Sequence, residues 1–198
     1  MRGKIIMKQI NNEYYAKKIF EIFEGLLNQF KIINNKKWGN PAGQTDEMET
    51  FEIKNNEGTI WCSLIEWTNA GTLETNRVGL IATIPLENKT SSLGHIVEVT
   101  IPFEFNRRFN TRAYKENGLV EIRNYGKFSI GRKGIKKKDF FDFLRKKNKD
   151  LINIDEEKKE YITVFSIKDG QLSKEDFANS LIKFTYLIKE FKDQKRRI

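Results

Sequence analysis

Glycines and basic side chains suited to anion binding are concentrated between positions 126 and 138. Three glycines there let the backbone approach a ligand closely, and a helix that begins near residue 135 would offer free N–H groups to an anion. The pattern differs from a Walker phosphate loop, because Arg132 and Lys133 stand where such loops carry Lys and Ser or Thr. We predict phosphate contact through Lys127, Arg132, Lys133, Lys136 and Lys137. The alternative interpretation is a glycine-bearing turn whose lysines are simply solvated.

A second basic group precedes this stretch and is interleaved with aromatic residues. Arg107, Arg108 and Arg112 stand beside Phe109 and Tyr114. A guanidinium can form two hydrogen bonds to one phosphate, and an aromatic ring can stack on a base. The combination predicts contact with single-stranded nucleic acid. The alternative is that Phe109 packs in the core while the arginines form surface ion pairs.

The positive charge of the chain is concentrated in the segment that holds both groups. The formal net charge is +9, and residues 105–149 contain fifteen Lys and Arg against four Asp and Glu, a local charge of +11. Such a balance favours anionic partners through long-range attraction and counterion release. We therefore predict a non-enzymatic protein that binds nucleic acid or another polyanion through residues 107–138. The alternative is that the charge serves solubility alone.

An acidic and basic set near the N-terminal third suggests a metal-dependent enzyme. Asp46 precedes a Glu-x-Lys pattern at Glu52 and Lys54, after a helix that bears Glu21 and Glu24. This arrangement resembles the PD-(D/E)xK nucleases, over about a quarter of the chain. The resemblance implies that two acids hold Mg²⁺ and that the lysine positions or activates the attacking water. Only five residues separate Asp46 from Glu52, which is short for the hairpin that normally intervenes.

Other residue types that could support catalysis are scarce. The chain has one histidine, His95, and one cysteine, Cys62, which argues against a catalytic triad or a His-based metal cluster. We interpret Cys62, which has apolar neighbours, as a core thiol. We therefore predict no catalytic residue, metal or cofactor. Trp38 lies in a segment rich in Gly, Asn and Pro, where an exposed ring could anchor a protein partner, so a protein-interaction module is the second functional interpretation.

The composition of the chain indicates its domain organisation and its cellular compartment. With 198 residues and 38% hydrophobic residues, we expect one globular domain over 1–198, with a disordered basic tail at 195–198. A single cysteine favours a reducing compartment, so we predict a cytoplasmic location. No apolar stretch approaches the ~20 residues of a membrane span. The sequence leaves the oligomeric state and the choice between DNA and RNA open.

The periodicity of apolar residues predicts the elements that position these groups. Expected helices cover residues 12–30, 135–147 and 173–192, and expected strands cover 50–54, 59–68, 78–86, 96–105, 119–125, 127–130 and 161–167, with a loop at 34–47. Apolar side chains alternate strictly at Val97, Val99, Ile101, Phe103 and Phe105. Pro102 lacks a backbone N–H, which predicts an edge strand or a bulge there.

The order of these elements predicts the fold class. The strands follow one another without intervening helices, which is typical of an α+β protein. We expect an N-terminal helix, a mostly antiparallel meander sheet, and then a helix, a strand and a helix packed on one face. The strand at 59–68 carries apolar residues on both faces, so we expect it to lie centrally in the sheet, covered on both sides. The layout resembles several small chaperone-like folds, which fits the protein-interaction interpretation.

Overall fold

The computed structural model describes residues 12–34, 37–39, 45–47, 49–68, 75–85, 98–104, 137–154, 158, 160–165 and 172–196. The described part is an α+β fold with an antiparallel sheet, as the sequence predicts. Its elements, in chain order, are α1 (Asn12–Leu27), β1 (Lys31–Asn34), β2 (Lys37–Gly39), β3 (Thr45–Glu47), β4 (Thr50–Lys54), β5 (Thr59–Thr68), β6 (Thr75–Thr83), β7 (Glu98–Glu104), α3 (Lys137–Lys147), the short 3-10 helix η2 (Lys149–Leu151), β8 (Ile152–Ile154), β9 (Glu160–Ile162) and α4 (Lys174–Arg196).

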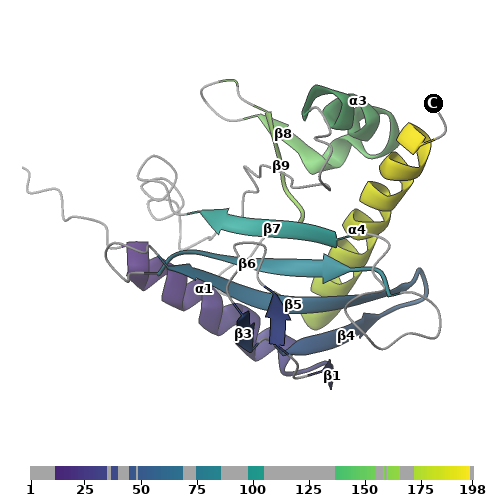
Figure 1. Cartoon of the computed structure of the whole chain (residues 1–198). Coiled ribbons are helices and arrows are strands. Elements are labelled where there is room, and N and C mark those ends of the chain that lie inside the picture. The colour runs from purple at the N-terminus through teal and green to yellow at the C-terminus, as the bar shows by residue number, and fades with distance from the viewer. Residues whose placement is uncertain are drawn as a thin grey trace, which may run out of the picture.

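The main sheet has five antiparallel strands in the order β1-β4-β5-β6-β7 (Figure 1). The strand β5 is central, as predicted, because it pairs with β4 on one side and β6 on the other. The strand β7 lies at one edge of the sheet formed by the described strands, and Pro102 faces Gly79 of β6, in agreement with the prediction of an edge or a bulge. Val99 and Ile101 of β7 are buried, as their alternation predicts.

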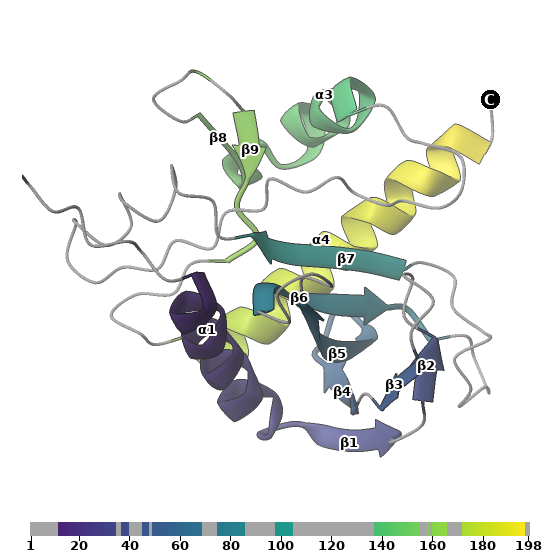
Figure 2. The same cartoon turned by 60° about the vertical axis from the view of Figure 1, so that its left-hand side comes forward.

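Helices α1 and α4 pack against one face of this sheet (Figure 2). Their apolar stripes repeat every three or four residues, which gathers them on one side of each helix. Phe23 of α1 and Phe177 of α4 are fully buried, with ring centroids 5.9 Å apart. The predicted stripe of α4 is confirmed, since Phe177, Leu181, Phe184, Ile188 and Phe191 are all buried. These aromatic contacts join the two helices over the sheet.

The opposite face of the sheet is also buried at its centre. Trp61, Ile65 and Ile81 have exposed fractions of 9%, 7% and 2%, so the expectation that β5 is covered on both sides is confirmed. Their neighbours include Thr50 and Ser63, whose hydroxyl groups share a hydrogen bond of 2.9 Å. A buried hydroxyl needs such a partner, because its desolvation is otherwise uncompensated.

The C-terminal half of α4 packs against α3 at one end of the sheet (Figure 2). Phe140 of α3 lies 6.4 Å from Phe184 and 5.1 Å from Phe191, measured between ring centroids. The hairpin β8–β9 lies beside α3, and Figures 1 and 2 both show it at this end of the molecule. The molecule therefore has a helical end built on aromatic rings.

Several predicted boundaries are wrong. The segment 34–47, expected to be a loop, contains β2 and β3, which pair with each other, and Asn40, Pro41 and Gly43 fall in the sequence between these two strands. The strand expected at 78–86 is β6, which begins at Thr75 and ends at Thr83. Within the described residues, the strand expected at 161–167 is β9, which covers Glu160–Ile162. It pairs with β8, and β8 was not predicted because three residues are too few to show an alternating pattern.

Lys195, the first residue of the expected basic tail, lies in α4. The helix α4 continues to Arg196, and the ammonium of Lys195 lies 2.8 Å from a carboxylate oxygen of Asp139 in α3. The same ammonium lies 5.9 Å from the ring centroid of Phe191. These tertiary contacts extend the helix beyond the point where its apolar stripe ends.

Candidate functional site

Most of the predicted phosphate-binding residues lie outside the part of the chain that the structure describes. These are Arg107, Arg108, Arg112, Lys127, Arg132, Lys133 and Lys136, together with the strands predicted at 119–125 and 127–130. The side chains of Trp38 and Phe103 and the whole of His95 lie outside it as well. Lys137 is the first residue of α3, so the predicted basic stretch runs directly into a described helix.

The helix α3 separates its apolar and basic residues onto two sides. Phe140, Phe141, Phe143 and Leu144 are buried against the core. Lys138 and Lys146 are exposed, and helical spacing puts them on the opposite, solvent side. Lys149, also exposed, follows in η2. The aromatic side therefore holds a basic surface in place at the end of the predicted stretch.

Ion pairs neutralise only some of the cations at this end of the molecule. Arg145 contacts the carboxylates of Asp142 and Glu160, and the hydrogen bond to Glu160 is the main cause of the raised pKa of its guanidinium. Lys147 pairs with Glu190 of α4. Within the described residues, Lys138, Lys146 and Lys149 form no ion pair. We name these three the α3 lysines.

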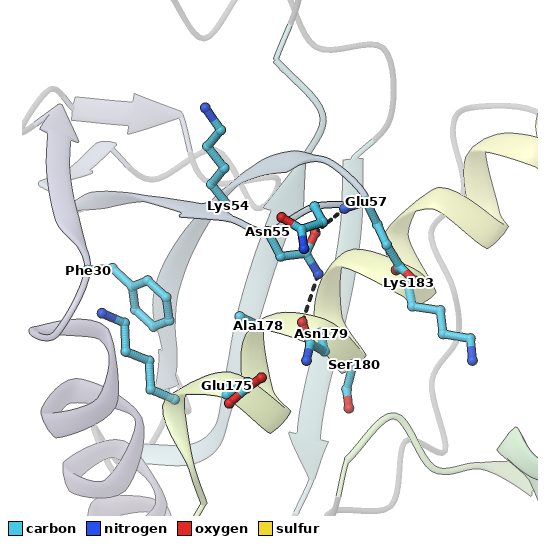
Figure 3. Close-up of a pocket in the computed structure, with 11 residues that line it drawn as sticks. Phe30, Lys54, Asn55, Glu57, Glu175, Ala178, Asn179, Ser180 and Lys183 are labelled. Carbon is cyan, nitrogen blue, oxygen red and sulfur yellow. Dashed lines mark hydrogen bonds between the residues drawn. The ribbon is translucent and has the colours of Figure 1, made fainter.

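A groove of about 740 Å³ lies at the other end of α4 (Figure 3). Its walls are the turn between β4 and β5, the first ten residues of α4, and the ring of Phe30 just after α1. The residues that line it are Phe30, Lys54, Asn55, Asn56, Glu57, Lys174, Glu175, Ala178, Asn179, Ser180 and Lys183. Most of these residues are polar or charged, so the groove offers charges and hydrogen bonds beside its apolar surface.

The groove was not predicted from the sequence, although the strands β4 and β5 and the helix α4 that line it were. In the turn at 55–58, the side chain of Asn55 accepts hydrogen bonds from the backbone N–H groups of Glu57 and Gly58. Ser173 caps α4, since its hydroxyl accepts a hydrogen bond from the backbone N–H of Asp176. The β4–β5 turn and α4 are more than a hundred residues apart in sequence, so no local sequence pattern indicates that they are in contact.

The residues of the nuclease-like pattern are not brought together in the described structure. The side chains of Glu52 and Lys54 alternate with Phe51 and Ile53, which are buried under the helices. Glu52 therefore lies on the sheet face opposite to α1, which carries Glu21 and Glu24. Asp46 lies in β3 with only its backbone described. Among described residues, no group of three or more His, Cys, Asp or Glu could hold a metal ion.

Two titratable groups on β5 have pKa values that differ from their ordinary values. Cys62 is fully buried on β5, and burial raises the pKa of its thiol, which keeps it protonated. Glu66 lies at the end of the same strand, where desolvation and then the charge of Glu24 raise the pKa of its carboxyl group. Cys62 thus packs as a core thiol, as interpreted from the sequence.

Comparisons with known proteins add no further constraint. No family model, curated protein or solved structure matches the chain. Within the described residues, none of the helices is both long and apolar enough to cross a membrane.

Proposed function

We propose that this protein binds nucleic acid or another polyanion through residues 107–138, and that the α3 lysines extend the contact surface. The observation that supports the proposal is the pairing pattern on α3. Arg145 and Lys147 are held by carboxylates, whereas Lys138, Lys146 and Lys149 are exposed and unpaired in the described structure. A lysine that no carboxylate neutralises can pair with a phosphate without first breaking an ion pair, and the nucleic acid then releases a condensed counterion.

The proposed mechanism is phosphate neutralisation without base readout. Each lysine that meets a phosphate releases a counterion, so affinity falls with salt by about 0.7 to 0.9 units of log K per log unit of salt for each contact. A row of lysines contacts the backbone and reads no base edge, so sequence preference is slight. The arginines and aromatic residues at 107–114 would add stacking on single strands.

A salt titration with labelled single-stranded and double-stranded oligonucleotides tests the proposal. Replacing Lys138, Lys146 and Lys149 together by Ala lowers the magnitude of the salt slope by about two to three units, because three phosphate contacts are lost. Replacing Arg132, Lys133 and Lys136 has an effect of the same size. The matched control replaces three exposed lysines outside the basic stretch, Lys17, Lys54 and Lys183, and retains the wild-type slope.

Two results would contradict the proposal. One is the absence of oligonucleotide binding by the wild-type chain at low salt, where electrostatic affinity is greatest. The other is an equal change of slope in the α3 variant and in the control, since a uniform loss reflects net charge rather than a site. Circular dichroism and thermal unfolding of each variant confirm that the fold is intact.

A further inference from the structure

The groove beside α4 has walls that are fixed in relation to each other. The amide of Asn55 donates a hydrogen bond of 2.8 Å to the side-chain oxygen of Asn179, which joins the β4–β5 turn to α4 (Figure 3). Gly58 packs so closely on Tyr186 that an added Cβ would lie 2.6 Å from its ring. The groove is therefore formed before any ligand arrives, which lowers the entropic cost of binding.

The charges of the groove are of both signs, and none is neutralised by the described protein. Three lysines line it, Lys54, Lys174 and Lys183, together with Glu57 and Glu175. None of these five forms an ion pair within the described residues, and Lys174 lies instead 4.9 Å from the ring centroid of Phe30. Figure 3 shows Lys54 and Lys183 extending on different sides of the Asn55–Asn179 pair.

This charge pattern indicates a polypeptide occupant rather than a nucleic acid. A phosphate backbone would satisfy the lysines but would be repelled by Glu57 and Glu175, and like charges at an interface oppose association. A peptide with several acidic residues and a few basic ones satisfies both signs. The exposed amide of Asn179 can also hydrogen-bond a peptide backbone.

The chain itself contains a segment with this complementary pattern. The connection between β8 and β9 reads Asp155, Glu156, Glu157, Lys158 and Lys159, which is three acids followed by two lysines. It is preceded by Ile154, whose side chain is 66% exposed, one of two large hydrophobic side chains exposed in the described part of the chain. The segment has three acidic residues, as many as the lysines of the groove, and two lysines, as many as the glutamates of the groove.

We propose that the groove beside α4 binds the β8–β9 connection, residues 155–159, of a second copy of this chain. In the same copy, the strands on either side of this connection lie at the other end of α4. Ile154 pairs with Glu160, and β8 lies beside α3, which packs on the C-terminal half of α4. The groove lies on the N-terminal ten residues of that helix.

The arrangement predicts a weak, concentration-dependent association. A groove of this size buries less surface than a permanent interface, so the contact belongs to the transient class. Because the groove and the hairpin are at opposite ends of α4, two antiparallel copies that exchange both contacts form a closed dimer. A single contact leaves one groove and one hairpin free, and these can bind a third copy as concentration rises.

Sedimentation velocity of the full-length chain, from about 10 μM to about 1 mM, measures this association. The salt is held at about 0.15 M, where screening limits the effect of the overall charge to about 8 Å. The groove variant replaces Lys54, Lys174 and Lys183 by Glu. Its association constant falls at least about tenfold, because three exposed ion pairs are replaced by like-charge contacts. All three lysines are exposed, so the fold is preserved.

Charge exchange separates a direct contact from a general charge effect. Replacing Asp155, Glu156 and Glu157 by Lys weakens association as the groove variant does, and combining both sets of substitutions in one chain restores it. The matched control replaces the three α3 lysines by Glu, which changes the net charge by the same amount as the groove variant. The control retains self-association and loses oligonucleotide binding, so the two sites are tested independently.

Three results would overturn this proposal. The first is a wild-type chain that stays monomeric over the whole concentration range. The second is failure of the combined variant to regain association while its circular dichroism remains that of the wild type. The third is loss of oligonucleotide binding in the groove variant but not in the α3 control, which would assign the groove to nucleic acid instead. None of these results bears on the polyanion surface of α3 except the third, which would also contradict the proposed function.

Discussion

The two ends of α4 hold their surface charges in different ways. At the C-terminal end, aromatic rings of α3 and α4 pack together, and carboxylates pair with Arg145 and Lys147, whereas the α3 lysines stay exposed. At the N-terminal end, hydrogen bonds and one glycine join the β4–β5 turn to the helix, and the charges around the groove are of both signs. Lysines that form no ion pair in the described structure suit a repetitive polyanion, whereas charges of both signs without ion pairs suit a polypeptide.

The comparison also shows how packing determines which charges are available. At the α3 end, carboxylates from β9 and α4 reach Arg145 and Lys147, so only part of the positive charge stays unpaired. At the groove, charges of opposite sign are close in the sequence yet form no ion pair in the described structure. A count of charges in the sequence therefore overstates the number of cations available at the α3 end, and it does not reveal the groove.

The largest expected effect comes from removing the aromatic support of α3. Phe140 is buried with an exposed fraction of 1% and contacts three other phenylalanine rings. Phe140→Ala lowers the free energy of unfolding by about 3–5 kcal/mol, since a large cavity replaces the ring. Urea unfolding measures the change. A loss below about 1 kcal/mol, the range of surface substitutions, would show that α3 is not anchored through this ring.

The corresponding change at the groove end acts by overpacking. Gly58→Ala places a methyl group against the Tyr186 ring and destabilises the fold by about 1–3 kcal/mol. Tyr186→Ala in the same chain removes the clash, so the double variant is less destabilised than the sum of the two single variants. Additive effects in this cycle would contradict the close contact. Thermal unfolding followed by circular dichroism measures the stability of the two single variants and the double variant.

A smaller effect is expected at the start of α4, on the edge of the groove. Ser173→Ala removes the acceptor for the backbone N–H of Asp176 and costs about 1 kcal/mol of stability. Ser173→Asp keeps an acceptor at this position and serves as the control, with stability close to that of the wild type. Equal losses in the two variants would show that the cap contributes nothing to the helix.

The smallest effect is expected for an ion pair at the α3 end. Lys147→Ala breaks the contact with Glu190 between two partly exposed side chains and changes the free energy of unfolding by at most about 1 kcal/mol. The difference from the wild type shrinks as salt is added, because exposed pairs are screened. A change above about 2 kcal/mol that persists at high salt would indicate that the pair is part of the α3 packing.

Local patterns in the sequence determined most of the regular elements. The stripes of α1 and α4, the alternation at Val99 and Ile101 and the Ser173 cap each depend on neighbours in the chain, so they were predictable. Strands of three or four residues, such as β1, β2 and β8, were not predicted, because pairing partners stabilise them more than their own residues do.

Only the tertiary structure decided which charged groups are available for binding. The sequence placed the positive charge in residues 105–149, but the ion pairs of Arg145 and Lys147 involve partners on β9 and α4. The groove depends on a contact between Asn55 and Asn179, which are 124 residues apart. Such contacts arise because packing of apolar stripes brings distant segments together, and the polar residues on those segments are carried along with them.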